Sequence, residues 1–332
     1  MPKLRIGILG AGNIAHRWMR DVHTVEEAEI TCVGSRDAVR ARSFAEKWGI
    51  PNAVEGYRAL VEHPQVDAVY VATPHPMHCE HALLAMRAGK HVLCEKPAAL
   101  NAAQLQQMQA CAKECGLFLM EAMWTRLFPA VLRAKQLLAE GAIGALRAVR
   151  AQFCFDVPFD AASRLFAKEL GGGALLDVGC YPIAFALDMF GCAPDQVAGV
   201  AEIGSTGVDE QNAISLRFPG GGVAMLASGV RAAMPVVAVL YGETGSLRIP
   251  NFYHPDRLLL EHGGQAATVF HQPYVPEGFA FELRHMCECI QDGLLESPRM
   301  SHADSMAVMR VMDALRAQWG IVYPDDEEPA EA

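Results

Sequence analysis

The opening segment of the chain constrains its fold more than any other. An apolar run of strand length, residues 4–9, leads directly into G-x-G-x-x-A from Gly10 to Ala15. A strand, then glycines, then a helix is the context that a dinucleotide-binding fingerprint requires. Gly10 permits a tight turn, and Gly12 lets the main chain approach a pyrophosphate. Asn13 and Ile14 begin the helix whose unpaired N–H groups would meet the phosphates. The sequence predicts a dinucleotide site here; a glycine turn without a ligand is the alternative.

Composition limits the class of protein. A chain of 332 residues is long for one core, so two domains are expected. The net charge of −10, without any basic run, argues against a nucleic-acid surface. No 18-residue apolar segment is free of charges and no signal peptide is recognisable, so we expect no membrane association. Ten scattered cysteines without C-x-x-C favour a reduced, cytoplasmic protein.

The second expected strand, residues 29–34, bears on cofactor choice. NAD-specific sites carry an acidic residue at the end of this strand, which accepts from the ribose 2′-OH. Here the positions are Ser35 and Arg36, a hydroxyl and a guanidinium that suit a 2′-phosphate. Asp37 fits as the N-cap of a helix over residues 38–48. The pattern favours NADP over NAD, although Arg36 could also be a solvated surface residue.

The next apolar run, residues 66–72, ends in a segment rich in histidine. Three histidines and Cys79 between Thr73 and His81 suggest zinc, but their spacing matches no usual zinc framework. A doubly wound sheet places its ligand at the carboxyl ends of its strands. We therefore expect Thr73, Pro74 and His78 to line the cofactor cleft, and we expect no metal.

A further strand, residues 91–94, ends in Glu95-Lys96-Pro97. Lysine and glutamate at the end of a buried strand are poorly explained by packing, because such residues are seldom buried unless paired or functional. Pro97 would fix the chain here through a cis bond. Helices over 81–88 and 102–115 and a strand over 117–120 complete a doubly wound parallel sheet.

The second half changes pattern. It predicts an α+β domain with a large open, mainly antiparallel sheet, because glycine-rich turns separate several of its strands. The expected strands are residues 146–155, 196–204, 212–218, 223–230, 236–241, 246–249 and 257–260. Helices over 279–295 and 303–319 close the chain. With one face covered by helices, the other face of this sheet is available for a subunit partner.

A glycine-rich segment between the first two of these strands carries candidate chemistry. It runs from Leu170 to Pro182 and opens a helix to about residue 190. Asp177 and Tyr181 are four residues apart and share one face if the segment is helical. Pro182 restricts them to the first turn, where the helix dipole also favours a carboxylate. The alternative is an aspartate cap followed by a core tyrosine.

Together these motifs resemble the Gfo/Idh/MocA family, named for glucose–fructose oxidoreductase, inositol dehydrogenase and rhizopine catabolism. The matching motifs are G-I-L-G-A-G-N-I-A, T-P-H-P-M-H, E-K-P, M-W-T-R-L-F-P and L-G-G-G-A-L-L-D-V-G-C-Y-P. The M-W-T-R element, together with a tyrosine at 181, resembles the dimeric dihydrodiol dehydrogenase and D-xylose dehydrogenase branch of this family. The resemblance implies a Rossmann domain (1–123), a substrate and dimerisation domain (124–323) and a homodimer formed through the open sheet. We expect the acidic tail (324–332) to be disordered. His75, where many members have asparagine, departs from the pattern.

The resemblance also implies residue roles. Lys96, Asp177 and Tyr181 match the catalytic lysine, aspartate and tyrosine. The expected reaction is hydride transfer between nicotinamide C4 and a secondary alcohol or carbonyl of a sugar, polyol or cyclic diol. The ammonium of Lys96 would lower the pKa of Tyr181 by favouring phenolate; Lys96 as the proton carrier is an alternative. Further candidates are Glu95, Trp124 and Arg126 for the cofactor, and Phe155, Arg164 and Phe279 for the substrate. A redox-assisted glycosidase and a non-catalytic NADP sensor are the other classes considered.

Overall fold

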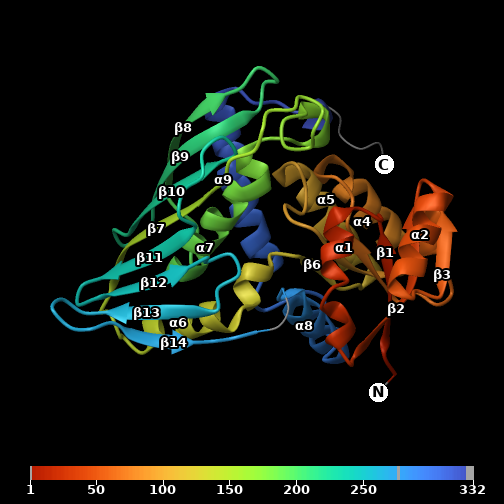
Figure 1. Ribbon diagram of the computed structural model, residues 1–332, viewed down its shortest axis with the longest axis horizontal. Coiled ribbons are helices and arrows are strands. Elements are labelled where there is room, and N and C mark those ends of the chain that lie inside the picture. The colour runs from red at the N-terminus through yellow and green to blue at the C-terminus, as the bar shows by residue number, and fades with distance from the viewer. Residues whose placement is uncertain (1, 275–276, 327–332) are drawn as a thin grey trace. The chain divides into compact units, whose positions relative to one another are not determined.

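The structure is a computed structural model that describes residues 2–274 and 277–326 (Figure 1). These residues divide into two compact units, 2–122 with 277–302 and 123–274 with 303–326. The first unit contains a parallel sheet in the order β3-β2-β1-β4-β5-β6. Its strands are β1 (Leu4–Leu9), β2 (Ala28–Ser35), β3 (Asn52–Glu55), β4 (Ala68–Val71), β5 (His91–Cys94) and β6 (Leu119–Glu121). The predicted doubly wound parallel sheet is confirmed.

Helices connect these parallel strands, as βαβ crossovers require. They are α1 (Asn13–Trp18), α2 (Ala38–Trp48), α3 (Tyr57–Val61), α4 (His78–Arg87) and α5 (Ala102–Cys115). The central strands are apolar throughout; all four residues of β4 are buried, as a strand covered on both faces requires. Edge strand β6 is protected, because Leu119 N–H donates to Leu295 O and its carbonyl lies 3.0 Å from His302 Nε2.

Helix α8 (Phe279–Gln291) belongs to the first unit, although the sequence placed this segment in the second domain. Buried polar contacts explain the difference. Asp21 Oδ2 accepts from the N–H groups of Gly278 (2.7 Å) and Ala280 (3.2 Å) at the start of α8. Trp18 Nε1 donates to the buried Glu282 at 3.2 Å. These partners are some 260 residues away in sequence, so no local pattern could indicate them.

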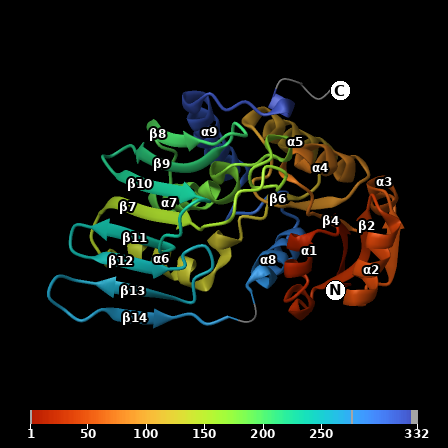
Figure 2. The same cartoon turned by 45° about the horizontal axis from the view of Figure 1, so that its top comes forward.

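The second unit is built on a mixed, mainly antiparallel sheet in the order β14-β13-β12-β11-β7-β10-β9-β8. The strands are β7 (Leu146–Cys154), β8 (Gln196–Ile203), β9 (Asp209–Arg217), β10 (Val223–Gly229), β11 (Val237–Gly242), β12 (Ser246–Pro250), β13 (Arg257–Glu261) and β14 (Thr268–His271). Only β7 and β10 pair in parallel. Figures 1 and 2 show α6 (Pro129–Ala139), α7 (Cys180–Phe190) and α9 (His302–Trp319) on one side of this sheet. The expected open sheet with one helix-covered face is confirmed.

Several elements of the fold differ from the sequence-based expectation. Helices α3 and α6 were not predicted. Strands β3 and β14 were not predicted, and β14 is mostly exposed, so it lacks the apolar alternation that marks a strand. Of the tail expected to be disordered, residues 324–326 form a 3₁₀ turn. Asp326 there pairs with Arg316 at 2.8 Å and accepts from Tyr323 N–H. Residues 327–332 lie outside the described part of the chain.

One helical run, Lys168–Phe190, is long and apolar enough to cross a membrane by composition, but 94% of its most apolar window is buried inside the protein. Burial of this kind marks a core helix. All ten cysteines lie in the described residues and all are free thiols.

Candidate functional site

The glycine loop after β1 has the geometry that its sequence predicts. Gly10 has φ +110°, and a Cβ there would lie 2.9 Å from Ala72 O, so only glycine fits. Gly12 is the N-cap of α1, and a Cβ there would meet only Ala72 O, at 3.9 Å. Ala15 is fully buried against the sheet. Asn13 and Ile14 open the helix, whose first turn has no side-chain cap. The first N–H groups of α1 are thus left for a ligand.

The end of β2 carries the residues predicted to select the cofactor. Ser35 is buried, and its Oγ accepts from Asp37 N–H at 3.2 Å. Asp37 caps α2 through Val39 and Arg40 N–H, as predicted. Arg36 between them is exposed. An exposed cation thus follows directly on a buried hydroxyl at the carboxyl edge of the sheet.

The end of β4 brings Thr73 and His81 together. Thr73 Oγ1 lies 2.9 Å from His81 Nδ1, and both side chains are buried. The ring of Tyr57 meets His81 edge-on at 4.4 Å. Burial, with a contribution from the charge of Arg36, lowers the pKa of His81 to about 4, so this ring is neutral at pH 7. Pro74 is exposed beside them.

His78 occupies a different place from the predicted cleft wall. It is fully buried, with Nε2 2.8 Å from Thr73 O and Nδ1 2.8 Å from Pro97 O. Burial lowers the pKa of His78 to about 4, so the neutral ring donates to one of these carbonyls at a time. His78 therefore clamps the end of β4 to the segment after β5. Within residues 2–274 and 277–326, His, Cys, Asp and Glu form no group of three that could hold a metal.

The E-K-P motif follows β5, and its two charged residues have different surroundings. Glu95 is buried; its Oε1 accepts from Tyr70 Oη at 2.5 Å and its Oε2 from Lys96 N–H at 3.1 Å. Burial raises the pKa of Glu95. Both carboxylate oxygens of Glu95, which was predicted to contact the cofactor, thus accept hydrogen bonds inside the protein, and one of them fixes the main chain of Lys96. Lys96 is half-buried at the strand end, and the Lys96–Pro97 bond is cis, as predicted.

In the second unit, Asp177 and Tyr181 lie on a helix with an irregular start. Asp177 belongs to a π-helical turn (Leu175–Gly179), and Tyr181 is the second residue of α7. The plain α-helix expected from the sequence is therefore wrong at this point. Pro182 has no N–H to give the carbonyl four residues earlier, and a π turn is a local widening that tolerates the missing bond. Both candidate side chains are buried.

Arg164, predicted as a substrate residue, forms an ion pair with Asp177 at 2.7 Å. The Arg164 side chain is 60% exposed, whereas that of Asp177 is 8% exposed, so the pair joins a buried carboxylate to the surface. Phe155, the other predicted substrate residue of this unit, packs against the cluster of Phe166, Ala174 and Val230. Phe155 and Arg164 thus lie in the segment between β7 and the π-helical turn, and Arg164 contacts Asp177 directly.

Aromatic residues that sequence reasoning missed surround Tyr181. Its ring centroid lies 5.5 Å from that of Phe153 and 5.9 Å from that of Tyr253. His254 stacks edge-on against Tyr253 at 4.1 Å, and Trp124 lies 6.2 Å from both. A signal was present in N-F-Y-H-P, two aromatics and a histidine in a turn between two strands. Trp124, predicted as a cofactor residue, packs beside this aromatic group, and its contact with the cofactor stays a prediction.

Arg126 and Phe279 each have partners within their own unit. Arg126 is buried and paired with Asp304 (3.0 Å) and Asp188 (3.8 Å), so its charge is balanced inside the second unit; its predicted contact with the cofactor stays a prediction. Phe279 is the first residue of α8 in the first unit, where the guanidinium of Arg17 lies 5.6 Å from its ring. Lys96 thus belongs to the first unit, and Asp177 and Tyr181 to the second.

Comparison with known proteins gives a consistent assignment. Residues 4–123 match the family model described as an oxidoreductase family with an NAD-binding Rossmann fold. Residues 131–248 match the GFO/IDH/MocA C-terminal domain. Trans-1,2-dihydrobenzene-1,2-diol dehydrogenase of Danio rerio is 39% identical over 98% of this chain and 99% of its own length. The Homo sapiens protein of the same name is 33% identical over the same shares.

Solved structures agree. KijD10, a 3-ketoreductase from Actinomadura kijaniata in complex with NADP and TDP-benzene, is 32% identical, with a TM-score of 0.86 over 95% of this chain and 97% of its own. Aldose-aldose oxidoreductase from Caulobacter crescentus is 28% identical, with a TM-score of 0.87 over 96% and 98%. With both domain models and full-length relatives in agreement, the chain belongs to the Gfo/Idh/MocA family of oxidoreductases.

Proposed function

We propose that this protein is an NADP-dependent dehydrogenase or reductase acting on a secondary alcohol, or its carbonyl, of a sugar, polyol or cyclic trans-diol. The observation that carries the proposal is similarity across 98% of the chain to dihydrodiol dehydrogenases. KijD10 in complex with NADP supports the cofactor, and its description as a 3-ketoreductase supports reaction at a carbonyl; the aldose-aldose oxidoreductase supports a sugar substrate.

The residues of the first unit fit a dinucleotide. The cradle at Gly10 excludes any Cβ, and Gly12 leaves space beside the uncapped start of α1. Ser35 and Arg36 would hold the 2′-phosphate, the hydroxyl as a donor and the guanidinium as an ion pair. Thr73 and Pro74 would border the adenosine side, with Tyr57 and His81 behind Thr73.

Lys96, Asp177 and Tyr181 would transfer the proton and orient the substrate. Bound NADP would supply the hydride acceptor or donor at nicotinamide C4. In oxidation, Tyr181 Oη takes the proton of the substrate hydroxyl; in reduction, it returns that proton to the carbonyl oxygen. The role that the family resemblance implies for Lys96 is to favour the phenolate of Tyr181 through its ammonium charge. Asp177, tethered to Arg164, accepts a hydrogen bond from a neighbouring substrate hydroxyl and so orients the ring.

The aromatic group beside Tyr181 supports a ring-shaped substrate. Phe153 and Tyr253 offer flat apolar faces, which suit the C–H face of a pyranose or a cyclohexadiene diol. A panel of pentoses, hexoses, inositols and cyclic trans-diols, followed at the NADPH absorbance, tests this substrate class. Turnover of a nitrophenyl glycoside without net NADPH change would indicate a glycosidase. NADP binding without turnover of any panel member would indicate a sensor.

Arg36→Ala tests the cofactor preference. Loss of a charge-assisted contact to the 2′-phosphate costs about 1.5–3 kcal/mol, so the Kd for NADP should rise roughly tenfold or more. The Kd for NAD should stay near that of the wild type, because NAD has no 2′-phosphate. Quenching of protein fluorescence measures both. Equal weakening of the two cofactors, or a wild-type preference for NAD, would contradict the assignment.

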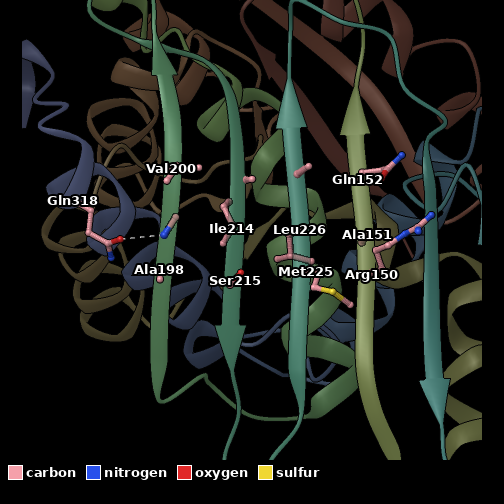
Figure 3. Close-up of a pocket in the computed structure, with 13 residues that line it drawn as sticks. Arg150, Ala151, Gln152, Ala198, Val200, Ile214, Ser215, Met225, Leu226 and Gln318 are labelled. Carbon is pink, nitrogen blue, oxygen red and sulfur yellow. Dashed lines mark hydrogen bonds between the residues drawn. The ribbon is translucent and has the colours of Figure 1, made fainter.

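We also propose that the protein forms a homodimer through the open face of the eight-stranded sheet. Val200 on β8 is 72% exposed, and Met225 and Val223 on β10 are 47% and 42% exposed; β9 lies between these two strands. Figure 3 shows this face, which is hollowed by about 530 Å³ and includes Arg150, Ser215 and Gln318 in its lining. An exposed apolar sheet face of this kind is typical of an interaction surface.

The free thiols support a reduced, cytoplasmic location.

A further inference from the structure

A buried carboxylate from a distant strand caps the turn that carries Asp177. Asp209, the first residue of β9, is 1% exposed, and its Oδ2 accepts from Leu175 N–H at 2.8 Å. Leu175 is the first residue of the π-helical turn. The cap therefore comes from 34 residues away, whereas a helix usually finds its cap in the residue just before it.

The glycine-rich motif before Asp177 is shaped around this carboxylate. Gly173 has φ +114°, and a Cβ there would lie 2.5 Å from Asp209 Oδ1. A Cβ at Gly172 would lie 2.8 Å from Ala167 O. Any side chain at 173 would displace Asp209 from the turn, so the glycines serve a close approach between two protein segments.

Further buried groups hold Asp209 in place. Asn212 Nδ2 donates to the same Oδ2 at 2.8 Å, and Asn212 Oδ1 accepts from Ser228 Oγ at 2.8 Å. On the other side, Tyr323 Oη donates to Gly172 O at 2.5 Å. Strands β9 and β10 and the segment after α9 thus converge on residues 172–175, six to nine residues before Tyr181.

We propose that Asp209 is a positioning residue of the active site, which fixes the turn that presents Asp177 and Tyr181. It acts through the Leu175 N–H and touches neither substrate nor cofactor. The proposal rests on the proposed function for its effect on turnover, but the capping contact itself stands on the geometry of the second unit alone.

The charge of Asp209 changes near neutral pH. Burial raises its pKa from 3.8 to about 7, while the contacts from Asn212 and Leu175 oppose the rise. Tyr323 is the titratable side chain that faces it across Gly173; burial raises the pKa of Tyr323 further above its usual range, with Asp209 contributing. Arg316 and Asp326 lie behind Tyr323, and the adjacent Glu210 pairs with Arg231 at 3.1 Å. Above pH 7 an anionic acceptor faces the start of the turn.

The test compares Asp209→Ala, which removes the acceptor, with Asp209→Asn, which keeps an oxygen for the Leu175 N–H. Asp195→Asn is the matched control, because it also removes a carboxylate, but from an exposed ion pair with Arg217 just before β8. Two quantities are measured: amide hydrogen exchange of the peptide over residues 173–181, and turnover per bound NADPH. Counting bound NADPH restricts the comparison to folded protein.

We expect D209A to raise exchange in this peptide at least tenfold and to lower turnover per NADPH site about tenfold or more, with the Kd for NADPH within twofold of the wild type. D209N should restore both to within about threefold, and D195N should match the wild type. Wild-type exchange and turnover in D209A would overturn the proposal. If D209A does not fold, the turnover of D209N and of the wild type is compared from pH 6 to pH 9. A rise of turnover near pH 7 that occurs in the wild type and is lost in D209N supports the proposal. A rise that persists unchanged in D209N overturns the proposal. Absence of wild-type turnover on every substrate would instead refute the proposed function, while the exchange comparison would still test the cap.

Discussion

At the scale of single residues, the proposed chemistry depends on Lys96 and Tyr181, which come from different units. Lys96→Met keeps most of the side-chain bulk and removes the charge. It should depress kcat by at least the ~10²-fold ascribed to a positioned proton carrier, and Tyr181→Phe should do likewise. The double variant should be little worse than either single one, because residues that act as one unit are not additive. Steady-state assays across pH measure all three variants.

NADP binding provides the control for these variants. Because Gly10, Gly12 and Arg36 are unchanged, the Kd measured by fluorescence should stay close to that of the wild type. Near-normal turnover in both single variants would show that the two side chains only line the pocket. The proton chemistry would then move to Asp177, since both ring nitrogens of His78 already face main-chain carbonyls in the core.

At the scale of elements, the junction of β4 and α4 should make the first unit sensitive to acid. The pKa of His81 is lowered to about 4, against about 6.5 in an unfolded chain. Because the folded protein binds a proton at His81 less readily than the unfolded chain does, the contribution of His81 to the free energy of unfolding is fully present above pH 6.5. This contribution is lost as pH falls from 6.5 through 4. Wild type should therefore lose up to about 3 kcal/mol relative to His81→Asn over this range.

Urea unfolding at pH 7.5, 5.5 and 4.5 checks this prediction. The difference in unfolding free energy between wild type and H81N should change steadily from the first pH to the last. It should not change between pH 7.5 and 8.5, where His81 is neutral in both states. A constant difference over the acid range would mean that His81 titrates normally in the folded protein.

The same elements show what a sequence can and cannot predict. The loop at Gly10 follows from local sterics, since a strand followed by G-x-G-x-x-A leaves few other conformations. The parallel sheet of the first unit follows similarly from apolar runs alternating with helices, except at the edge strand β3, which has no such run. The partners of buried polar groups, in contrast, do not follow from local sequence. Arg126 was proposed as a wall of the cofactor and substrate site, and nothing in the sequence indicated its ion pair with Asp188, which lies 62 residues away. Strand β9 was expected to begin at Asn212, because the polar residues Asp209 and Glu210 resemble a loop until their buried partners are known.

At the scale of the whole molecule, the aromatic group near Tyr181 and the loop around Gly10 each form within one unit. Each unit can therefore be tested for its own ligand contacts. Arg36→Ala addresses the first unit and Asp209→Ala the second, so cofactor affinity and turnover should respond separately. A variant that impaired both equally would indicate general loss of folding.

The homodimer is the remaining prediction at this scale. Light scattering at micromolar concentration should give about twice the chain mass of 36.0 kDa. Val200→Glu with Met225→Glu places two carboxylates on the open sheet face of each copy, where burial against a second copy would leave them desolvated and unpaired. This double variant should be monomeric, whereas Val39→Glu, an equally exposed apolar position on α2, should remain dimeric. A monomeric wild type would show that the open face meets no second copy, and a dimer that survives both changes would place the subunit contact on another surface.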